Sequence, residues 1–140
     1  MRIRTSLLLQ LRKGLSLGAG AAAVLMTLGM FLGWFVAGTR VRNSFEMFRI
    51  PQQLGLEGFT TIRVGWFLLP VVAVGVLGFV ALGRLRPAAA LLALQSFVSL
   101  CVGVIVVLSP INAGAGPAVT ILGGGAGLVV AAGLLVVGSE

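Results

Sequence analysis

The side chains that could perform acid–base, metal or thiol chemistry are few and scattered in this chain of 140 residues. It has no histidine and no tyrosine, and its carboxylates Glu46, Glu57 and Glu140 all lie outside the long uncharged stretches. General acid–base catalysis needs two such groups side by side, and a metal cage needs several ligands in one place. The sequence therefore predicts no catalytic residue, no metal and no cofactor, and an enzyme acting on lipid is the least favoured function.

The remaining polar side chains lie within an apolar run. Cys101 is the single cysteine and cannot form an internal disulfide, which argues against a thiol oxidoreductase. Gln95 and Ser99 are spaced to share one face of a helix, where they can hydrogen-bond to another helix or line a polar substrate path. Carriers coupled to ions or protons generally need an ionisable group within a span, and no predicted span contains one. We therefore expect Gln95 and Ser99 to serve in helix packing.

Membrane-spanning helices must position these residues. Hydrophobic residues make up 59% of the chain and charged residues only 9%, whereas soluble domains have about 25% charged residues. Each uncharged stretch reaches the roughly 20 residues that a helix needs to cross a bilayer, and none shows the alternation of a barrel strand. The sequence predicts an all-α membrane protein with a single domain, 1–140, that forms a four-transmembrane-helix bundle. The predicted spans are 14–38, 64–83, 87–108 and 117–138.

Basic residues at the ends of the spans predict the orientation. With four spans both termini share a side, which collects Arg2, Arg4, Arg12, Lys13, Arg84 and Arg86. The opposite side collects Arg40, Arg42, Arg49 and Arg63. The positive-inside rule then places both termini in the cytoplasm of a plasma (inner) membrane. We attribute much of the net charge of +7 to topology and to contact with membrane lipids, not to nucleic acid.

The segment before the first span, Thr5 to Arg12, places leucines beside basic residues. It is either a short interfacial helix or a helical extension of the span.

Glycine pairs predict where helices approach closely, because small residues drive helix packing in lipid. Gly29 with Gly33, and Gly123 with Gly127, each have the spacing that places both glycines on one helix face. We expect these glycines to contact a neighbouring helix, either within this chain or in a partner protein.

The loop 39–63 holds most of the chemistry outside the spans and predicts a short amphipathic helix. Asn43 is placed to cap this helix, with Glu46 three positions on, and Pro51 to end it. Phe45, Glu46, Phe48 and Arg49 are the candidate partner contacts. Such a helix could lie on the outer leaflet, cover its own bundle or dock a partner. The loop between the last two spans, 109–116, predicts a tight turn.

The chain resembles small four-span proteins of actinobacteria in four features. These are the segment RVRNSFEMFRIPQQLGL, the Trp-Phe start of the second span, the short basic turn and the GAGP start of the last span. Among these, the chain resembles an accessory subunit of a mycobacterial envelope complex, such as the small membrane subunit of the mammalian-cell-entry type lipid importer, and no functional residues are carried over from it. The span layout is also similar to that of claudins, but their paired loop cysteines and W-GLW motif are absent.

Small size, the absence of catalytic groups, glycine-faced helices and an amphipathic outer loop favour a non-catalytic accessory, stabilising or assembly subunit of a larger cell-envelope transport complex. Its expected partner is a larger integral membrane protein complex, and the resemblance implies lipid import as the transport. The alternative is a small transporter or channel that works as a homo-oligomer, because one bundle of four short helices encloses little space.

Overall fold

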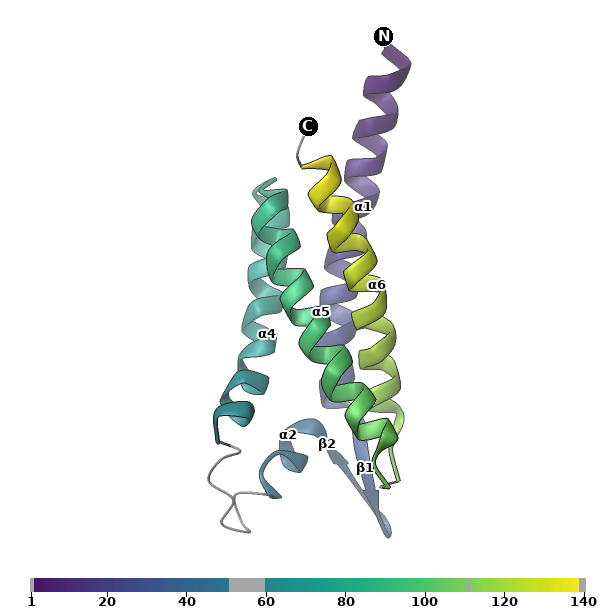
Figure 1. Cartoon of the computed structure of the whole chain (residues 1–140), viewed down its shortest axis with the longest axis vertical. Coiled ribbons are helices and arrows are strands. Elements are labelled where there is room, and N and C mark those ends of the chain that lie inside the picture. The colour runs from purple at the N-terminus through teal and green to yellow at the C-terminus, as the bar shows by residue number, and fades with distance from the viewer. Residues whose placement is uncertain (1, 51–59, 111, 139–140) are drawn as a thin grey trace.

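The computed structural model describes residues 2–50, 60–110 and 112–138, and four long helices dominate these residues. They are α1 (Arg2–Phe31), α4 (Thr60–Ala81), α5 (Leu85–Leu108) and α6 (Ala115–Val137), and they run side by side along the longest axis (Figure 1). All four are long and apolar enough to cross a membrane. The structure thus has four candidate spans in the predicted order, which is consistent with a multi-pass membrane protein.

The first span differs from its prediction at its far end. α1 is one continuous helix from Arg2, as a helical extension of the span would be, but it ends at Phe31 and not at Gly38. The chain then forms a hairpin of two antiparallel strands, β1 (Gly33–Ala37) and β2 (Arg40–Asn43), with Gly38 at a φ of 61° in the turn. The purely helical fold class is therefore wrong in this segment. Trp34, Phe35 and Val36 in β1 and Val41 in β2 favour the extended conformation, and a glycine adopts the positive φ at little cost.

The amphipathic segment of the first loop contains a single helical turn, α2 (Ser44–Met47). Its N-cap is Asn43, whose side-chain oxygen accepts a hydrogen bond from the backbone N–H of Glu46 at 3.0 Å. Pro51, the predicted end of the helix, lies outside the described residues, as does Glu57.

The last loop is joined to the hairpin. The backbone N–H of Val36 donates to the carbonyl of Asn112 at 3.0 Å, and that of Gly114 donates to the carbonyl of Trp34 at 3.1 Å. Phe35 pairs with Arg42 on one side and with Ala113 on the other, so β1 lies between β2 and this loop. The predicted tight turn is therefore also a partner of β1.

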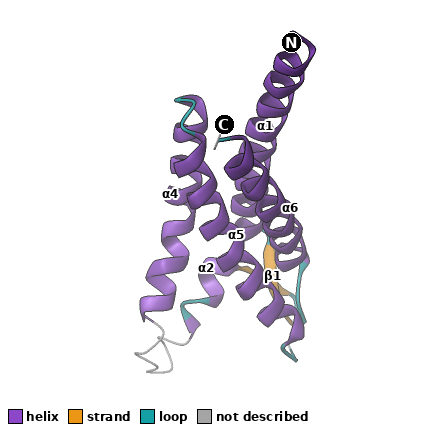
Figure 2. Cartoon of the chain, turned by 45° about the horizontal axis from the view of Figure 1, so that its top comes forward, coloured by secondary structure: helices purple, strands orange, loops and turns teal. Residues whose placement is uncertain are grey.

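The two ends of the bundle differ in construction (Figures 1 and 2). We call the end with β1, β2, α2 and the residues 109–114 the hairpin end. We call the other the termini end, because α1 begins there, α6 finishes there and the turn between α4 and α5 lies beside them (Figure 1).

The core consists of two clusters of buried side chains. One lies between the four long helices and contains small residues of α1 and α5 with Met26, Val76, Leu92 and Leu134. The other lies toward the hairpin end and is built around Met30, Trp34, Trp66, Leu69 and Val106. Small residues in the first cluster let the backbones of the helices approach closely, which is how helices associate in lipid. The second cluster carries the large aromatic side chains.

Candidate functional site

Polar side chains form a layer inside the bundle. Gln95, Ser96 and Ser99 of α5 and Thr120 of α6 are completely buried. The Nε2 group of Gln95 donates to the carbonyl of Ala23 at 3.4 Å, so Gln95 links α5 to α1. The Oε1 atom of Gln95 and the hydroxyl oxygens of Ser96 and Ser99 have no hydrogen-bond partner within the described part of the chain. Gln95 and Ser99 thus face other helices of the same bundle.

The predicted glycine contacts lie in the same region, with one exception. A Cβ at Gly123 would lie 2.8 Å from the Met26 side chain, and one at Gly127 would overlap the Ser96 hydroxyl. A Cβ at Gly29 would overlap the Thr120 side chain. These glycines therefore pack helix against helix within this chain. Gly33 does not, because it lies in β1, where a Cβ would meet Val41 of β2.

The polar layer does not line the depressions at the two ends of the bundle. Four depressions on the described surface are lined by residues of the hairpin end or of the termini end and their adjoining helix turns. None of these four is lined by Gln95, Ser96 or Ser99. The polar layer of one chain is thus closed off from these depressions.

A buried hydrogen-bond network holds the hairpin end together. The Ser44 hydroxyl donates to the carbonyl of Met30 at 2.7 Å and accepts from the Trp66 Nε1–H at 3.0 Å. The Trp34 Nε1–H donates to the carbonyl of Gly29 at 2.7 Å. Both indole rings are buried and meet edge to face, with centroids 5.2 Å apart. The sequence alone did not reveal Ser44 and Trp34. Ser44 has Met30 and Trp66 as partners, which are distant in sequence. Trp34 lies within an apolar run that resembles a helix.

The aromatic residues of the first loop pack onto the bundle itself. The Phe45 ring lies 5.0 Å from that of Phe31 and 4.9 Å from that of Phe67. The Phe48 ring lies 5.3 Å from that of Trp66. The sequence predicts that this segment lies on the outer leaflet, covers its own bundle or docks a partner. Phe45 and Phe48 cover the bundle. Glu46 and Arg49 lie on a different side of the segment and remain available for contact.

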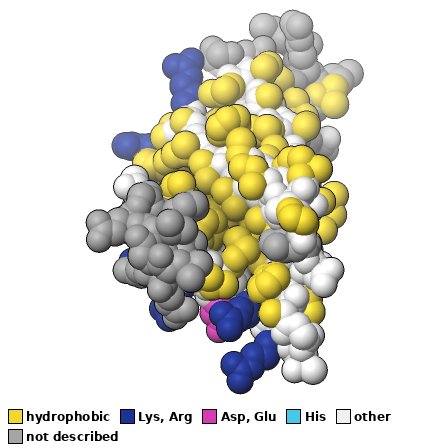
Figure 3. Space-filling model, turned by 60° about the horizontal axis from the view of Figure 1, so that its bottom comes forward, with side chains coloured by type: hydrophobic (Ala, Val, Ile, Leu, Met, Phe, Trp, Pro, Cys, Tyr) yellow, Lys and Arg dark blue, Asp and Glu magenta, His cyan; other side chains and the backbone are white. Residues whose placement is uncertain are grey.

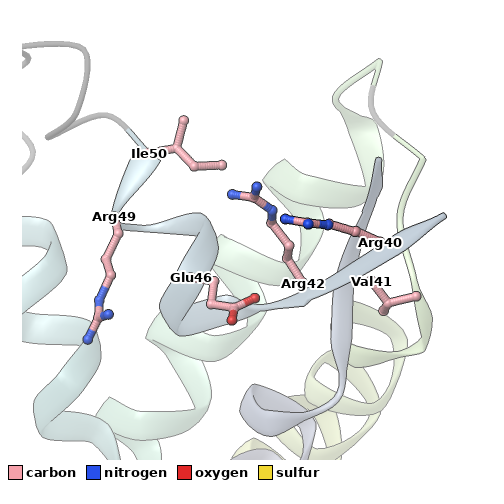
Figure 4. A pocket seen from close by; sticks show the side chains of 6 residues that line it. All are labelled: Arg40, Val41, Arg42, Glu46, Arg49 and Ile50. Carbon is pink, nitrogen blue, oxygen red and sulfur yellow. The ribbon is translucent and has the colours of Figure 1, made fainter. Parts of the chain in front are cut away.

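Glu46 and Arg49 line an open depression at the hairpin end with a volume of about 480 Å³. Its other lining residues are Arg40, Val41, Arg42 and Ile50. The side chains of Arg40 and Arg42 project side by side from β2, and that of Arg49 points away from them (Figure 4). We call this group the arginine depression.

The arginine depression lies beside the apolar surface of the helices. Hydrophobic side chains cover much of the visible face, and basic side chains gather next to an acidic one at the hairpin end (Figure 3). Guanidinium groups form paired hydrogen bonds with carboxylates and phosphates, so this depression is suited to an acidic ligand or protein surface.

The chain matches no known protein-family model, no curated protein and no solved structure.

The other chemistry in the described residues is sparse. Within them, no group of three or more His, Cys, Asp or Glu side chains could hold a metal ion. Cys101 is exposed on α5 and lies in an apolar stretch. The arginine depression is therefore the best-built candidate site for recognition at the hairpin end.

Proposed function

We propose that this protein is a non-catalytic accessory subunit that stabilises or assembles a larger transport complex of the cell envelope, such as a lipid importer. The observation that carries the proposal is the arginine depression, which presents the guanidinium groups of Arg40 and Arg42 side by side on a cap built into the end of the bundle (Figure 4). Its partner is a larger integral membrane protein with an acidic surface at the same level.

The construction of the hairpin end supports a docking role. Two carbonyls near the end of α1 bind Trp34 and Ser44, and Ser44 in turn binds Trp66 of α4. The β2 strand that carries Arg40 and Arg42 is paired with β1, which is paired with the last loop. The backbone of such a supported strand loses little conformational freedom on binding, and preorganisation of this kind favours affinity.

Val41 adds an apolar element to the surface. It lines the arginine depression and is 64% exposed. Protein interfaces commonly combine a desolvated apolar contact with arginine side chains, and arginine is enriched among the residues that contribute most to binding. Val41 lies between Arg40 and Arg42 in β2, so its side chain points to the opposite face of the strand (Figure 4).

The alternative is a homo-oligomeric transporter or channel. Its support is the unpartnered polar oxygens of Gln95, Ser96 and Ser99. These three residues lie within one bundle and are completely buried there. A path for a substrate would therefore require the helices to separate or copies of the chain to rearrange around α5. The accessory role needs no such change.

The test is recovery of the partner from native membranes in mild detergent. We compare the wild type with Arg40→Gln/Arg42→Gln, and use Lys13→Gln/Arg84→Gln as a control that removes the same charge at the termini end. Loss of two charge-assisted contacts should lower recovery of a stoichiometric partner by about tenfold or more, while the control retains it.

Equal recovery by both double variants would contradict docking at the hairpin end. A wild type that purifies alone and transports a solute in liposomes would instead support the alternative, especially if Gln95→Leu abolished the flux.

A further inference from the structure

The termini end carries a second basic depression, with a volume of about 690 Å³. It lies where α1 passes the turn between α4 and α5 and where α6 ends. Its lining residues are Arg12, Gly83, Arg84, Leu85, Arg86, Pro87, Val137 and Gly138.

Two arginines are fixed in place at this depression. Arg12 donates from Nη2 to the carbonyl of Gly83 at 3.2 Å, which connects α1 to the turn. Arg86 donates from Nε to the carbonyl of Gly138 at 3.0 Å, which connects the start of α5 to the end of α6. A guanidinium has five N–H donors, so each of these groups keeps further donors for a ligand.

The charge of this region is unbalanced within the described residues. Lys13 and Arg84 are exposed and make no side-chain hydrogen bond or ion pair to the residues that the structure describes. Among the described residues that line the depression there is no carboxylate. A ligand that carries net negative charge would therefore complement Arg12, Lys13 and Arg84.

An apolar groove continues from the basic depression along α1. It has a volume of about 540 Å³ and shares Arg12, Gly83 and Leu85 with that depression. Farther along α1 and α4 it is lined by Leu17 and Val80, and the Leu17 side chain is 76% exposed. A basic site that opens directly into an apolar groove is complementary to a molecule with an anionic head and a hydrocarbon tail.

We propose that the termini end binds an anionic phospholipid, with its phosphate on Arg12, Lys13 and Arg84 and one acyl chain in the groove beside Leu17 and Val80. Basic pockets between membrane helices are established sites for anionic headgroups, and neighbouring basic residues reinforce one another there. A zwitterionic lipid brings a cationic group that finds no described carboxylate among the residues lining the basic depression. The site is independent of the arginine depression and of the proposed accessory function.

Native mass spectrometry of the detergent-solubilised full chain tests this proposal. The protein is incubated with equal amounts of phosphatidylglycerol and phosphatidylcholine with the same acyl chains. We expect phosphatidylglycerol adducts to exceed phosphatidylcholine adducts by about tenfold for the wild type. Lys13→Gln/Arg84→Gln should reduce that ratio to about one, and Arg40→Gln/Arg42→Gln should leave it unchanged. Unchanged circular dichroism and elution volume establish that both variants are folded.

Three results would overturn the proposal. Equal binding of the two lipids by the wild type would exclude selectivity for an anionic headgroup. An equal loss in both double variants would show that total charge, not the site, attracts the lipid. Displacement of phosphatidylglycerol by millimolar glycerol phosphate would assign the site to a soluble anion and remove the role of the groove.

Discussion

Ser44 is the residue on which the hairpin end depends most. Its hydroxyl is fully buried and connects the end of α1, the start of α2 and the Trp66 indole of α4. A buried donor that loses its partner costs more than the bond itself contributed, because it was also removed from water. A small side chain at this position therefore has a large influence on the cap.

We expect Ser44→Ala to destabilise the protein by about 1–3 kcal/mol, because the Trp66 Nε1–H loses its partner in a buried environment. Ser109→Ala is the control, since the Ser109 hydroxyl makes only a local bond to the carbonyl of Val106 at 2.6 Å and is part-buried. Thermal unfolding in detergent, followed by tryptophan fluorescence, measures both. A shift in Ser44→Ala no larger than in Ser109→Ala would be inconsistent with the network.

Among the elements, α6 packs closely against its neighbours because of two of its glycines. Gly123 and Gly127 leave room for Met26 of α1 and Ser96 of α5, and α6 packs chiefly against these two helices. Gly125 lies between them in sequence, but a Cβ at this position would meet no neighbouring side chain or helix within 4 Å. Gly123 and Gly127 therefore allow close helix packing, whereas Gly125 does not contribute to it. Replacing Gly123 or Gly127 by a large residue would disturb the bundle before it disturbed any partner.

Gly127→Ala and Gly125→Ala form a matched pair for this difference. The first should destabilise the protein by about 1–3 kcal/mol, because its methyl group overlaps the Ser96 hydroxyl. The second should be neutral or stabilising by up to about 1 kcal/mol, because alanine favours the helix over glycine. Thermal unfolding in one detergent compares them. Equal melting temperatures would refute the close contact of α6 with α5.

The elements also show which features the sequence could predict. The long helices follow from length and hydropathy alone, and the Asn43 cap follows from a side chain and a backbone group three positions apart. The strand Gly33–Ala37 could not be recognised in the same way, because it is as apolar and uncharged as the helix before it. Its structure depends on Arg40–Asn43 and on residues 112–114, and the latter contact is remote in sequence.

The candidate site could be predicted only in part, because some of its residues are brought together by contacts that are remote in sequence. Glu46 and Arg49 could be selected as polar residues of an amphipathic segment, and they line the arginine depression. Arg40 and Arg42 appeared in the sequence only as charges that determine topology. Their role as neighbours on one strand became visible with the register of the hairpin, which no pattern in residues 33–43 specified.

The whole molecule is a bundle with a basic group at each end and an apolar surface between them. Residues of the described termini end include Arg12, Lys13, Arg84 and Arg86, and those of the hairpin end include Arg40, Arg42, Arg49 and Arg63. The positive-inside rule favours the termini end as the cytoplasmic one when Arg2 and Arg4 are included. Under that orientation the proposed anionic lipid site would face the cytoplasmic leaflet, and the arginine depression would face the opposite side.

Single cysteines test this orientation. In a Cys101→Ser background, Arg40→Cys should react with a membrane-impermeant maleimide added to intact spheroplasts, because Arg40 is exposed at the hairpin end. Arg84→Cys, which is exposed at the termini end, should react only after the membrane is permeabilised. The reverse pattern would place both termini outside the cytoplasm.

The pairing of β1 with both β2 and the last loop has a consequence for biosynthesis. β1 and β2 leave the ribosome early, but residues 112–114 follow only after α4 and α5 have been made. The sheet-like cap therefore cannot close until α4 and α5 have been translated. A chain that ends before residue 112 would display Arg40 and Arg42 on an incomplete support. A partner that recognises the closed cap would therefore select chains that contain α4 and α5 over shorter ones.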